Sequence, residues 1–328
     1  MWSDVLLHVL SSPFILFFGL GILSGLIRSD LEFPEAFTRA LSLYIMLAIG
    51  LKGGIGLAKT SLHFSDLAAL LVTGILLSFF LPFLAYVLLR KATRSSRLDA
   101  AAIAAHYGSV SVVTFNCATM YLDMLNLPYQ DHFVTLLALM ESPAIFSGLI
   151  LAKFSRRLQE SKRAELLSPH LLREIFCNGS SVLLLGGVAI GFLAEPTQLQ
   201  VVKPFLVDPF HGILCLFLLD MGLLVTRYTH NLKSLSLPLL AFGLYMPIIG
   251  ASIGLVLAKM LGLEASDSLL FMVLSASASY IAVPAAIRVA LPKSNPLISM
   301  TLSLGITFPF NITLGIPLYW YALNFFSK

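Results

Sequence analysis

Long apolar segments fill most of the chain, and short polar segments separate them. About 20 apolar residues are enough to cross a bilayer as a helix. By this measure the pattern predicts ten spans, over residues 5–27, 36–58, 66–90, 98–124, 131–154, 171–194, 204–226, 235–261, 266–290 and 296–325. The predicted fold is therefore an all-α membrane protein with ten transmembrane helices.

Two of these spans are interrupted by small and hydroxyl-bearing residues. The fourth span is interrupted at residues 104–114 and the ninth at residues 275–284, which include Pro284. Irregular backbone at membrane depth is tolerated only where it is buried in protein or lines a polar cavity. A matched pair of interrupted spans is the best sequence indication of a transporter's binding site. We therefore expect discontinuous helices at both places.

Corresponding residues recur in the two halves of the chain at a nearly constant spacing. The spacing is 168 residues for four pairs and 166 for the fifth: Gly54/Gly222, Asp99/Asp267, Ser109/Ser277, Ser111/Ser279 and Pro143/Pro309. Five spans in each half would force the halves into opposite orientations, which is the inverted repeat common in secondary transporters. We expect a first repeat at 1–155, a cytoplasmic linker at 156–170 and a second repeat at 171–328. Chance alignment of similar apolar segments is the alternative.

The basic residues of the loops predict the orientation. Sixteen Lys and Arg residues lie in loops after odd-numbered spans, against four in the other loops and the C-terminus. The positive-inside rule then places the odd loops in the cytoplasm and both termini outside. The start lacks a basic segment before its apolar run, so residues 13–27 are expected to be a retained helix and not a signal peptide. This describes a multi-pass protein of a bacterial-type inner (plasma) membrane.

The composition agrees with a membrane protein. Only 12% of the residues are charged and 58% are hydrophobic, whereas about a quarter of an average soluble domain is charged. The net charge of +4 gives no indication of nucleic-acid binding, because the basic residues gather in loops. The three cysteines all fall in apolar spans, where packing is their expected role.

The interrupted spans predict an anion site. In an inverted repeat, the second halves of the two broken helices would begin at mid-membrane and face each other. Helix N-termini have free N–H groups and a partial positive charge, which suit an anion. The candidate substrate-binding residues are Gly108, Ser109, Ser111, Thr114, Ser275, Ser277 and Ser279. The alternative is that these small residues merely allow close helix packing.

A carboxylate inside an apolar span is a functional hypothesis by default. Glu141 lies in the fifth span, and Asn311 lies in the corresponding region of the tenth. Oxygen ligands favour a hard cation such as sodium over a transition metal. We therefore predict that Glu141 and Asn311 bind a sodium ion. A proton carrier, a structural ion pair or a hydrogen-bonded core acid are the alternatives for Glu141.

Opposite charges occupy corresponding positions in the second and seventh spans. Lys52 and Asp220 are 168 residues apart. Pairing across the interface of the two repeats is the preferred interpretation, and a role in gating or ion coupling is the alternative. His106, beside the first interruption, could titrate near neutral pH, but a hydrogen-bonded packing role is favoured.

No sequence motif indicates an enzyme or an ATP-driven pump. The chain has no Walker loop, dinucleotide fingerprint, HExxH or zinc spacing. Nucleophilic catalysis by a serine would need a base and an orienting group, and His106 lies in the same interruption as Ser109. We therefore expect no enzyme, and infer coupling to an ion gradient.

The two interruptions, together with residues 140–144 and 307–311, resemble the sodium-dependent bicarbonate transporter family known from cyanobacteria. The resemblance covers nearly the whole chain. It implies a core domain (helices 3–5 and 8–10) with crossing broken helices, a gate domain (helices 1, 2, 6 and 7) and a homotrimer. It also implies sodium-coupled bicarbonate import by alternating access. The serines at 109, 111, 277 and 279 would then bind the anion, with Glu141 and Asn311 beside them.

The connection at about 155–170 is shorter than in those cyanobacterial members, which bind a PII-like regulatory protein. That partner is therefore left open. A sodium- or proton-coupled symporter of another small organic anion, a cation–proton antiporter and a non-transporting receptor are the other functions considered. An antiporter usually has a carboxylate at the crossing, where this chain has serines. Bicarbonate has one charge and three oxygens in a plane, which suits converging donors.

Overall fold

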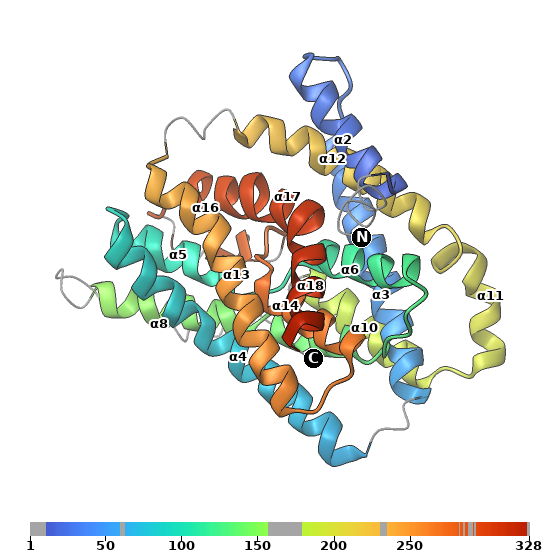
Figure 1. The fold of residues 1–328 in the computed structure, drawn as a ribbon. Coiled ribbons are helices and arrows are strands. Elements are labelled where there is room, and N and C mark those ends of the chain that lie inside the picture. Colours follow the sequence, from blue (N-terminus) through green and yellow to red (C-terminus); the bar gives the residue numbers. More distant parts are fainter. Residues whose placement is uncertain are drawn as a thin grey trace.

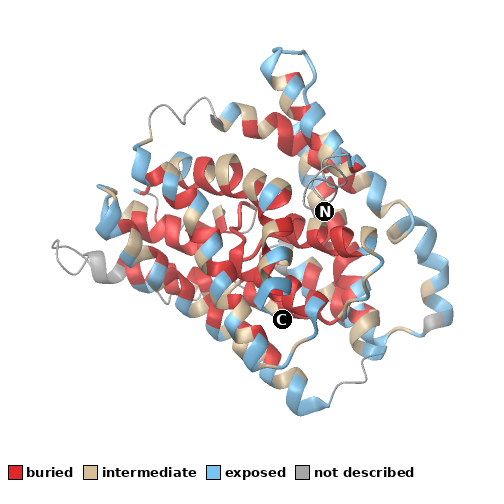
Figure 2. Cartoon of the chain, in the orientation of Figure 1, coloured by how far each residue is buried: buried red, intermediate tan, exposed pale blue. Residues whose placement is uncertain are grey.

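The computed structural model describes residues 11–59, 63–156, 179–229, 235–281, 283–284, 286–287, 291 and 293–326. Within these residues the secondary structure is helical, with no strand. Figure 1 shows the helices arranged around a core that contains the broken helices, with α11 at the edge of the molecule. Buried residues occupy the centre, and exposed residues follow the outer helices (Figure 2).

The predicted spans are present in the predicted order. Among the described residues, seven helical stretches are long and apolar enough to cross a membrane, and three shorter apolar helices complete the ten. The elements are α2 (Pro13–Leu26), α3 (Glu35–Lys59), α4 (Phe64–Ala92), α5 (Arg97–Gly108), α6 (Val112–Met124), α7 (Phe133–Met140), α8 (Pro143–Arg156), α10 (Gly179–Leu193), α11 (Pro196–Leu206), α12 (Phe210–Thr229), α13 (Leu237–Met260), α14 (Ala265–Ala276), α16 (Pro296–Leu302), η2 (Ser303–Thr307), α17 (Phe308–Phe310), η3 (Asn311–Gly315) and α18 (Ile316–Phe326).

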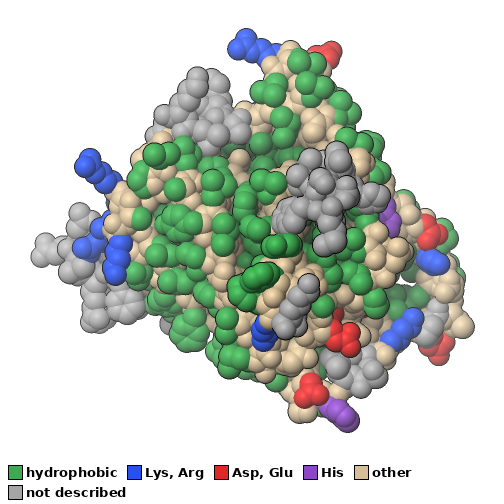
Figure 3. Space-filling view, in the orientation of Figure 1, with side chains coloured by type: hydrophobic (Ala, Val, Ile, Leu, Met, Phe, Trp, Pro, Cys, Tyr) green, Lys and Arg blue, Asp and Glu red, His purple; other side chains and the backbone are tan. Residues whose placement is uncertain are grey.

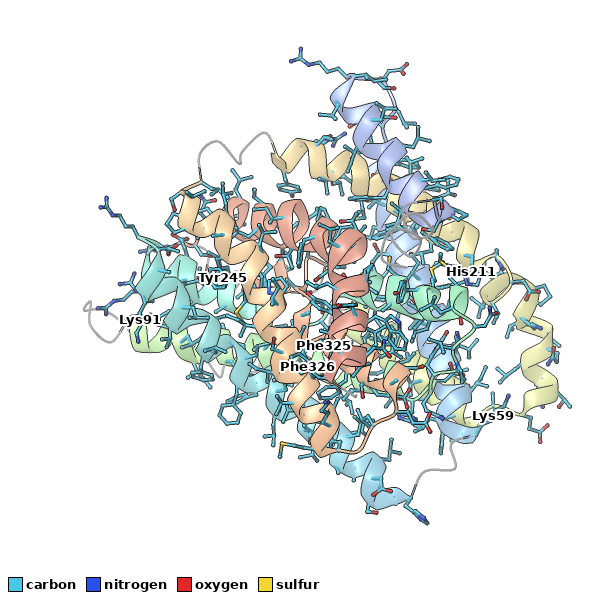
Figure 4. The ribbon with its side chains drawn as sticks, viewed as in Figure 1. Lys59, Lys91, His211, Tyr245, Phe325 and Phe326 are labelled. Carbon is cyan, nitrogen blue, oxygen red and sulfur yellow. The ribbon has the colours of Figure 1, made fainter. Side chains whose placement is uncertain are left out.

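The surface has the character of a protein in a bilayer. Large apolar side chains such as Phe80 and Val256 are each 58% exposed. Apolar side chains cover most of the face in Figure 3, and charged side chains lie mainly at its edges. Lys91 and Lys59 lie at opposite ends of the molecule (Figure 4).

The fourth and ninth spans are broken where the sequence predicts. Helix α5 ends at Gly108 and α6 begins at Val112, with Ser109 extended at φ −89° and ψ 164°. Helix α14 ends at Ala276, and Ser277 is extended at φ −83° and ψ 164°. Helical geometry resumes at Val283. The two breaks therefore begin with nearly the same backbone conformation, at residues 168 apart.

Other boundaries differ from the prediction. The seventh span begins at Phe210 and not at 204, because residues Pro196–Leu206 form a separate helix, α11, at the surface. The fifth span is interrupted at Glu141–Ser142, between α7 and α8. The tenth contains two π-helical segments, η2 and η3, on either side of Pro309. Most of the predicted linker (156–170) and the starts of the first and sixth spans lie outside the described residues.

Glycines bring two pairs of helices into close contact. Helix α3 packs on α10, and α12 packs on α2. A Cβ atom added to Gly54 would lie 2.1 Å from the Val188 carbonyl oxygen, and one added to Gly222 would lie 2.2 Å from the Phe18 carbonyl oxygen. Small residues permit such close backbone approach between membrane helices. The α3–α10 and α12–α2 contacts are therefore built in the same way.

Glycines on the partner helices, α10 and α2, make equally close contacts with α3 and α12. A Cβ atom added to Gly191 would lie 2.3 Å from the Leu51 carbonyl oxygen, and one added to Gly21 would lie 2.0 Å from the Leu219 carbonyl oxygen. Leu51 and Leu219 are again 168 residues apart. Corresponding residues of the two halves thus make corresponding contacts.

Gly54→Ala and Gly222→Ala should each destabilise the protein by about 1–3 kcal/mol, the usual cost of overpacking. The added methyl would overlap a backbone oxygen, so the helices must separate. Melting temperatures in detergent measure the effect. Gly19→Ala on α2 and Gly186→Ala on α10 are matched controls, because nothing lies within 4 Å of a Cβ atom at either position. If all four variants have the same melting temperature, the prediction is wrong.

Two carboxylates at corresponding positions hold the loops of the opposite half. Asp99, in the first turn of α5, accepts a hydrogen bond from the backbone N–H of Asn295 at 2.7 Å. Asp267, in the first turn of α14, accepts one from the backbone N–H of Gln130 at 2.9 Å. Asn295 precedes α16 and Gln130 precedes α7. Each broken helix is therefore attached to a loop of the other half of the chain.

Candidate functional site

The two breaks meet in the centre of the protein. The backbone N–H of Ser279 donates to the carbonyl oxygen of His106 at 2.9 Å. The N–H of Ser111 donates to Ser277 Oγ at 3.0 Å. We call residues 109–111 and 277–281 together the crossing. The structure thus brings together the serines that the sequence predicts at positions 109, 111, 277 and 279, all of them buried.

One helix begins at the crossing with unused donors. Ser111 caps α6, since its Oγ accepts from the N–H of Thr114 at 3.2 Å and from Thr114 Oγ1 at 3.0 Å. The first N–H groups of a helix have no acceptor within it. The N–H groups of Val112 and Val113 make no hydrogen bond to any described residue. The start of α6 therefore offers two free donors and a partial positive charge to an anion.

Ser109 and Ser277 fix the crossing through their hydroxyl groups. Ser109 Oγ donates to the backbone carbonyl oxygen of Glu141 at 3.1 Å. Ser277 Oγ donates to the carbonyl oxygen of Leu274 at 3.0 Å while it accepts from Ser111. These two hydroxyls therefore hold the broken segments in place as well as supplying oxygen atoms.

Two of the predicted residues are placed for close packing. Ser275 Oγ donates to the carbonyl oxygen of Phe271 at 2.7 Å, and it lies 2.8 Å from where a Cβ of Gly254 would be. Gly108 faces α4, where an added Cβ atom would lie 2.2 Å from Pro82 Cγ. These contacts favour packing as the role of Ser275 and Gly108, and substrate binding by them stays a prediction.

Tyr280 is a residue of the crossing that the sequence did not single out. Its hydroxyl faces the Ser111 side chain but makes no hydrogen bond of regular geometry. Its ring packs edge-on against Phe308, with centroids 5.2 Å apart. Only its place within the second interruption, at 275–284, could have indicated it. A buried hydroxyl beside Ser111 is a further donor for an anion.

Glu141 and Asn311 are each joined to a different broken helix. Glu141 is 3% exposed and is joined through its backbone carbonyl to Ser109. Asn311 Nδ2 donates to the carbonyl oxygen of Ala276 at 3.0 Å, and Asn311 Oδ1 accepts from Tyr319 at 2.8 Å. Both residues therefore lie beside the crossing, as the sequence predicts, and both carry oxygen atoms that suit a hard cation.

Two cavities of unequal size lie in the described part of the protein, and one of them reaches the crossing. The large cavity has a volume of about 1010 Å³, and its lining includes Thr38, Asp220, Tyr280, Ile281 and Met300. The small cavity has a volume of about 110 Å³, and its lining includes Lys52, Asn116, Asp131, Val134 and His211; His211 is labelled in Figure 4. The large cavity reaches the crossing at Tyr280 and Ile281.

A comparison with sequence families decides the class of the protein. The model of the Na⁺-dependent bicarbonate transporter superfamily matches residues 13–324. The chain belongs to this superfamily. It is therefore a multi-pass membrane protein of a transporter family and not an enzyme. Among curated proteins no match was found.

The predicted pairing of Lys52 with Asp220 is not formed in this member of the superfamily. Lys52 Nζ donates to the Tyr129 hydroxyl at 3.1 Å and lies 3.9 Å from Asp131 Oδ1. Asp220 Oδ2 accepts from Thr38 Oγ1 at 2.6 Å. The two residues lie in different cavities, so the preferred interpretation was wrong and a role in gating stays a prediction.

Hydroxyl contacts also join α5 to η2, which is part of the tenth span. The Tyr107 hydroxyl and Thr307 Oγ1 are 2.7 Å apart, and Thr307 Oγ1 donates to the carbonyl oxygen of Gly243 at 2.7 Å. His106 Nδ1 lies 2.8 Å from the carbonyl oxygen of Ala102, which fits the packing role favoured for it. The Tyr107–Thr307–Gly243 contacts therefore connect α5, η2 and α13 beside the crossing.

Proposed function

We propose that the protein imports bicarbonate together with sodium ions by alternating access. The observation that carries this proposal is the crossing of two broken helices, where free N–H groups of Val112 and Val113 lie beside serine hydroxyls. A planar anion with three oxygens matches such a set of donors. Sodium is a co-transported ion in this scheme and not a resident cofactor.

An inverted repeat underlies the proposed mechanism. The glycine contacts of α3–α10 and α12–α2 support it, because corresponding residues make corresponding contacts. The breaks at Ser109 and Ser277 have nearly equal backbone angles, and Asp99 and Asp267 bind equivalent loops. In such a repeat, exchanging the conformations of the two halves would close one cavity and open the other.

The two domains of the proposed mechanism follow helix packing. Helices α2, α3, α10 and α12 would form the gate domain, and their close pairwise contacts support this. The helices that meet at the crossing would form the core domain. Assembly as a homotrimer and binding of a PII-like regulator rest on the family resemblance alone.

The sidedness of the structure follows from its charges. The large cavity is lined by Arg39 and Arg227, which belong to the loops that the positive-inside rule places in the cytoplasm. The small cavity is lined by Lys52 and Asp131, and Lys52 lies toward the end of α3, whereas Arg39 lies near its start. We therefore interpret the structure as an inward-facing state, with both termini outside.

Uptake of labelled bicarbonate by purified protein in liposomes tests the proposal. An inward sodium gradient should stimulate uptake, while a potassium gradient of the same size should not. All assays are made at one alkaline pH. Protein-free liposomes at that pH measure how much label enters as CO₂ without the protein. Sodium-independent uptake would overturn the coupling, and uptake of a small carboxylate without bicarbonate would overturn the substrate.

A further inference from the structure

A buried carboxylate lies on the wall of the large cavity without a basic partner. Asp220 is 4% exposed, and Thr38 Oγ1 donates to its Oδ2 at 2.6 Å. Arg227, which also lines this cavity, pairs instead with Glu32 at 3.0 Å. No described Lys, Arg or His side chain lies within ion-pair distance of Asp220. The Asp220 carboxyl group therefore has no basic side chain in ion-pair contact, and Arg227 acts on it only at longer range.

The corresponding position in the small cavity carries the opposite charge, and that charge has partners. Lys52 Nζ lies 3.1 Å from the Tyr129 hydroxyl, 3.9 Å from Asp131 Oδ1 and 5.4 Å from the centre of the Tyr129 ring. Lys52 is on α3, whereas Tyr129 and Asp131 are in the loop between α6 and α7. In the small cavity Lys52 has a carboxylate at ion-pair distance, whereas in the large cavity the close contact of Asp220 is the Thr38 hydroxyl and Arg227 acts only at longer range.

An anion that leaves the crossing through the large cavity enters a space whose wall carries this carboxyl group. The cavity meets the crossing at Tyr280 and Ile281, and Asp220 lines the same cavity. Charges in a cleft with low-dielectric walls act more strongly than in bulk water. In its ionised form Asp220 disfavours an anion in this cavity and favours the departure of the anion from it.

We propose that Asp220 sets the affinity of the inward-facing state for the anion, by weakening anion binding on the cytoplasmic face. This inference rests on the proposed function. The carboxylate does not alter the driving force, which the ion gradients fix, but it lowers occupancy of the site from the cytoplasmic side.

Calorimetric titration of bicarbonate into the purified full-length protein, at saturating sodium, tests this inference. Asp220→Asn should bind bicarbonate about three- to tenfold more tightly than the wild type, a range expected from removing one partly screened like charge. Asparagine can still accept the hydrogen bond from Thr38. A gain in affinity is a result that mere structural damage would not produce.

Three further variants separate charge from structure. Asp220→Ser removes the charge in a second way and should also bind more tightly, which keeps the test valid if Asp220→Asn folds poorly. Thr38→Val removes the hydrogen bond but keeps the charge, so it should not gain affinity. Asp30→Asn removes an exposed carboxylate in the loop after α2 and should leave affinity unchanged.

The possible results have distinct meanings. Unchanged bicarbonate affinity in both Asp220 variants overturns the inference. If the wild type binds bicarbonate in a sodium-dependent way in the same experiment, the proposed function still stands. Weaker sodium binding without tighter bicarbonate binding would overturn it in favour of a cation site at Asp220. Wild-type protein that binds no bicarbonate would overturn the proposed function itself.

Discussion

Replacing Ser277 with alanine should raise the bicarbonate concentration that half-saturates uptake by about tenfold, the order of effect expected when a buried N–H loses its acceptor. Ser277 Oγ accepts from the N–H of Ser111 at 3.0 Å, and Ser111 in turn caps α6. Without this contact the start of α6 is no longer fixed against the second break. The donors proposed to bind the anion would then be less well placed.

The measurement is initial uptake at saturating sodium over a range of bicarbonate concentrations. Ser252→Ala is the matched control, because Ser252 Oγ makes a similar hydrogen bond to the carbonyl oxygen of Ile248 on the exposed side of α13. Its half-saturating concentration should equal that of the wild type. If Ser277→Ala transports like the wild type, the anion does not bind at the crossing.

Glu141→Gln should raise the half-saturating sodium concentration by more than about tenfold, because it removes a carboxylate, a preferred ligand of hard cations, from the predicted cation site. Glutamine keeps the size and the carbonyl oxygen of the side chain. The backbone carbonyl that accepts from Ser109 is also kept. The bicarbonate dependence at saturating sodium should therefore change little.

Sodium dependence of uptake at saturating bicarbonate is the measurement for this variant. Glu264→Gln is the matched control, since Glu264 is an exposed residue that precedes α14. Its sodium response should be that of the wild type. An unchanged sodium response in Glu141→Gln would rule out its carboxylate as a ligand of the coupling ion.

The helices and the two breaks could be predicted from sequence because each has a local cause. Twenty apolar residues in succession specify a span, and hydroxyl residues with Pro284 indicate where irregular backbone is tolerated. The boundaries of α3 (Glu35–Lys59) agree with the predicted 36–58 to one residue. Helix α11 was missed because its residues were assigned to a loop and to the start of the following span.

The contacts between distant residues could not be predicted in this way. The hydrogen bond from the Gln130 N–H to Asp267 depends on how the two halves pack, and a backbone donor has no sequence signal. The Lys52–Asp220 prediction failed for a related reason. An equal spacing along the chain indicates corresponding positions in the two halves and does not indicate proximity.

The paired glycine contacts have a consequence for how the protein is made. Gly21 lies against α12 and Gly54 against α10, so the first two described helices complete their packing only with helices from the second half of the chain. During synthesis the earlier helices enter the bilayer with these faces still covered by lipid. The newly made first half therefore has to remain in the membrane, incompletely packed, until the ribosome has delivered its partners.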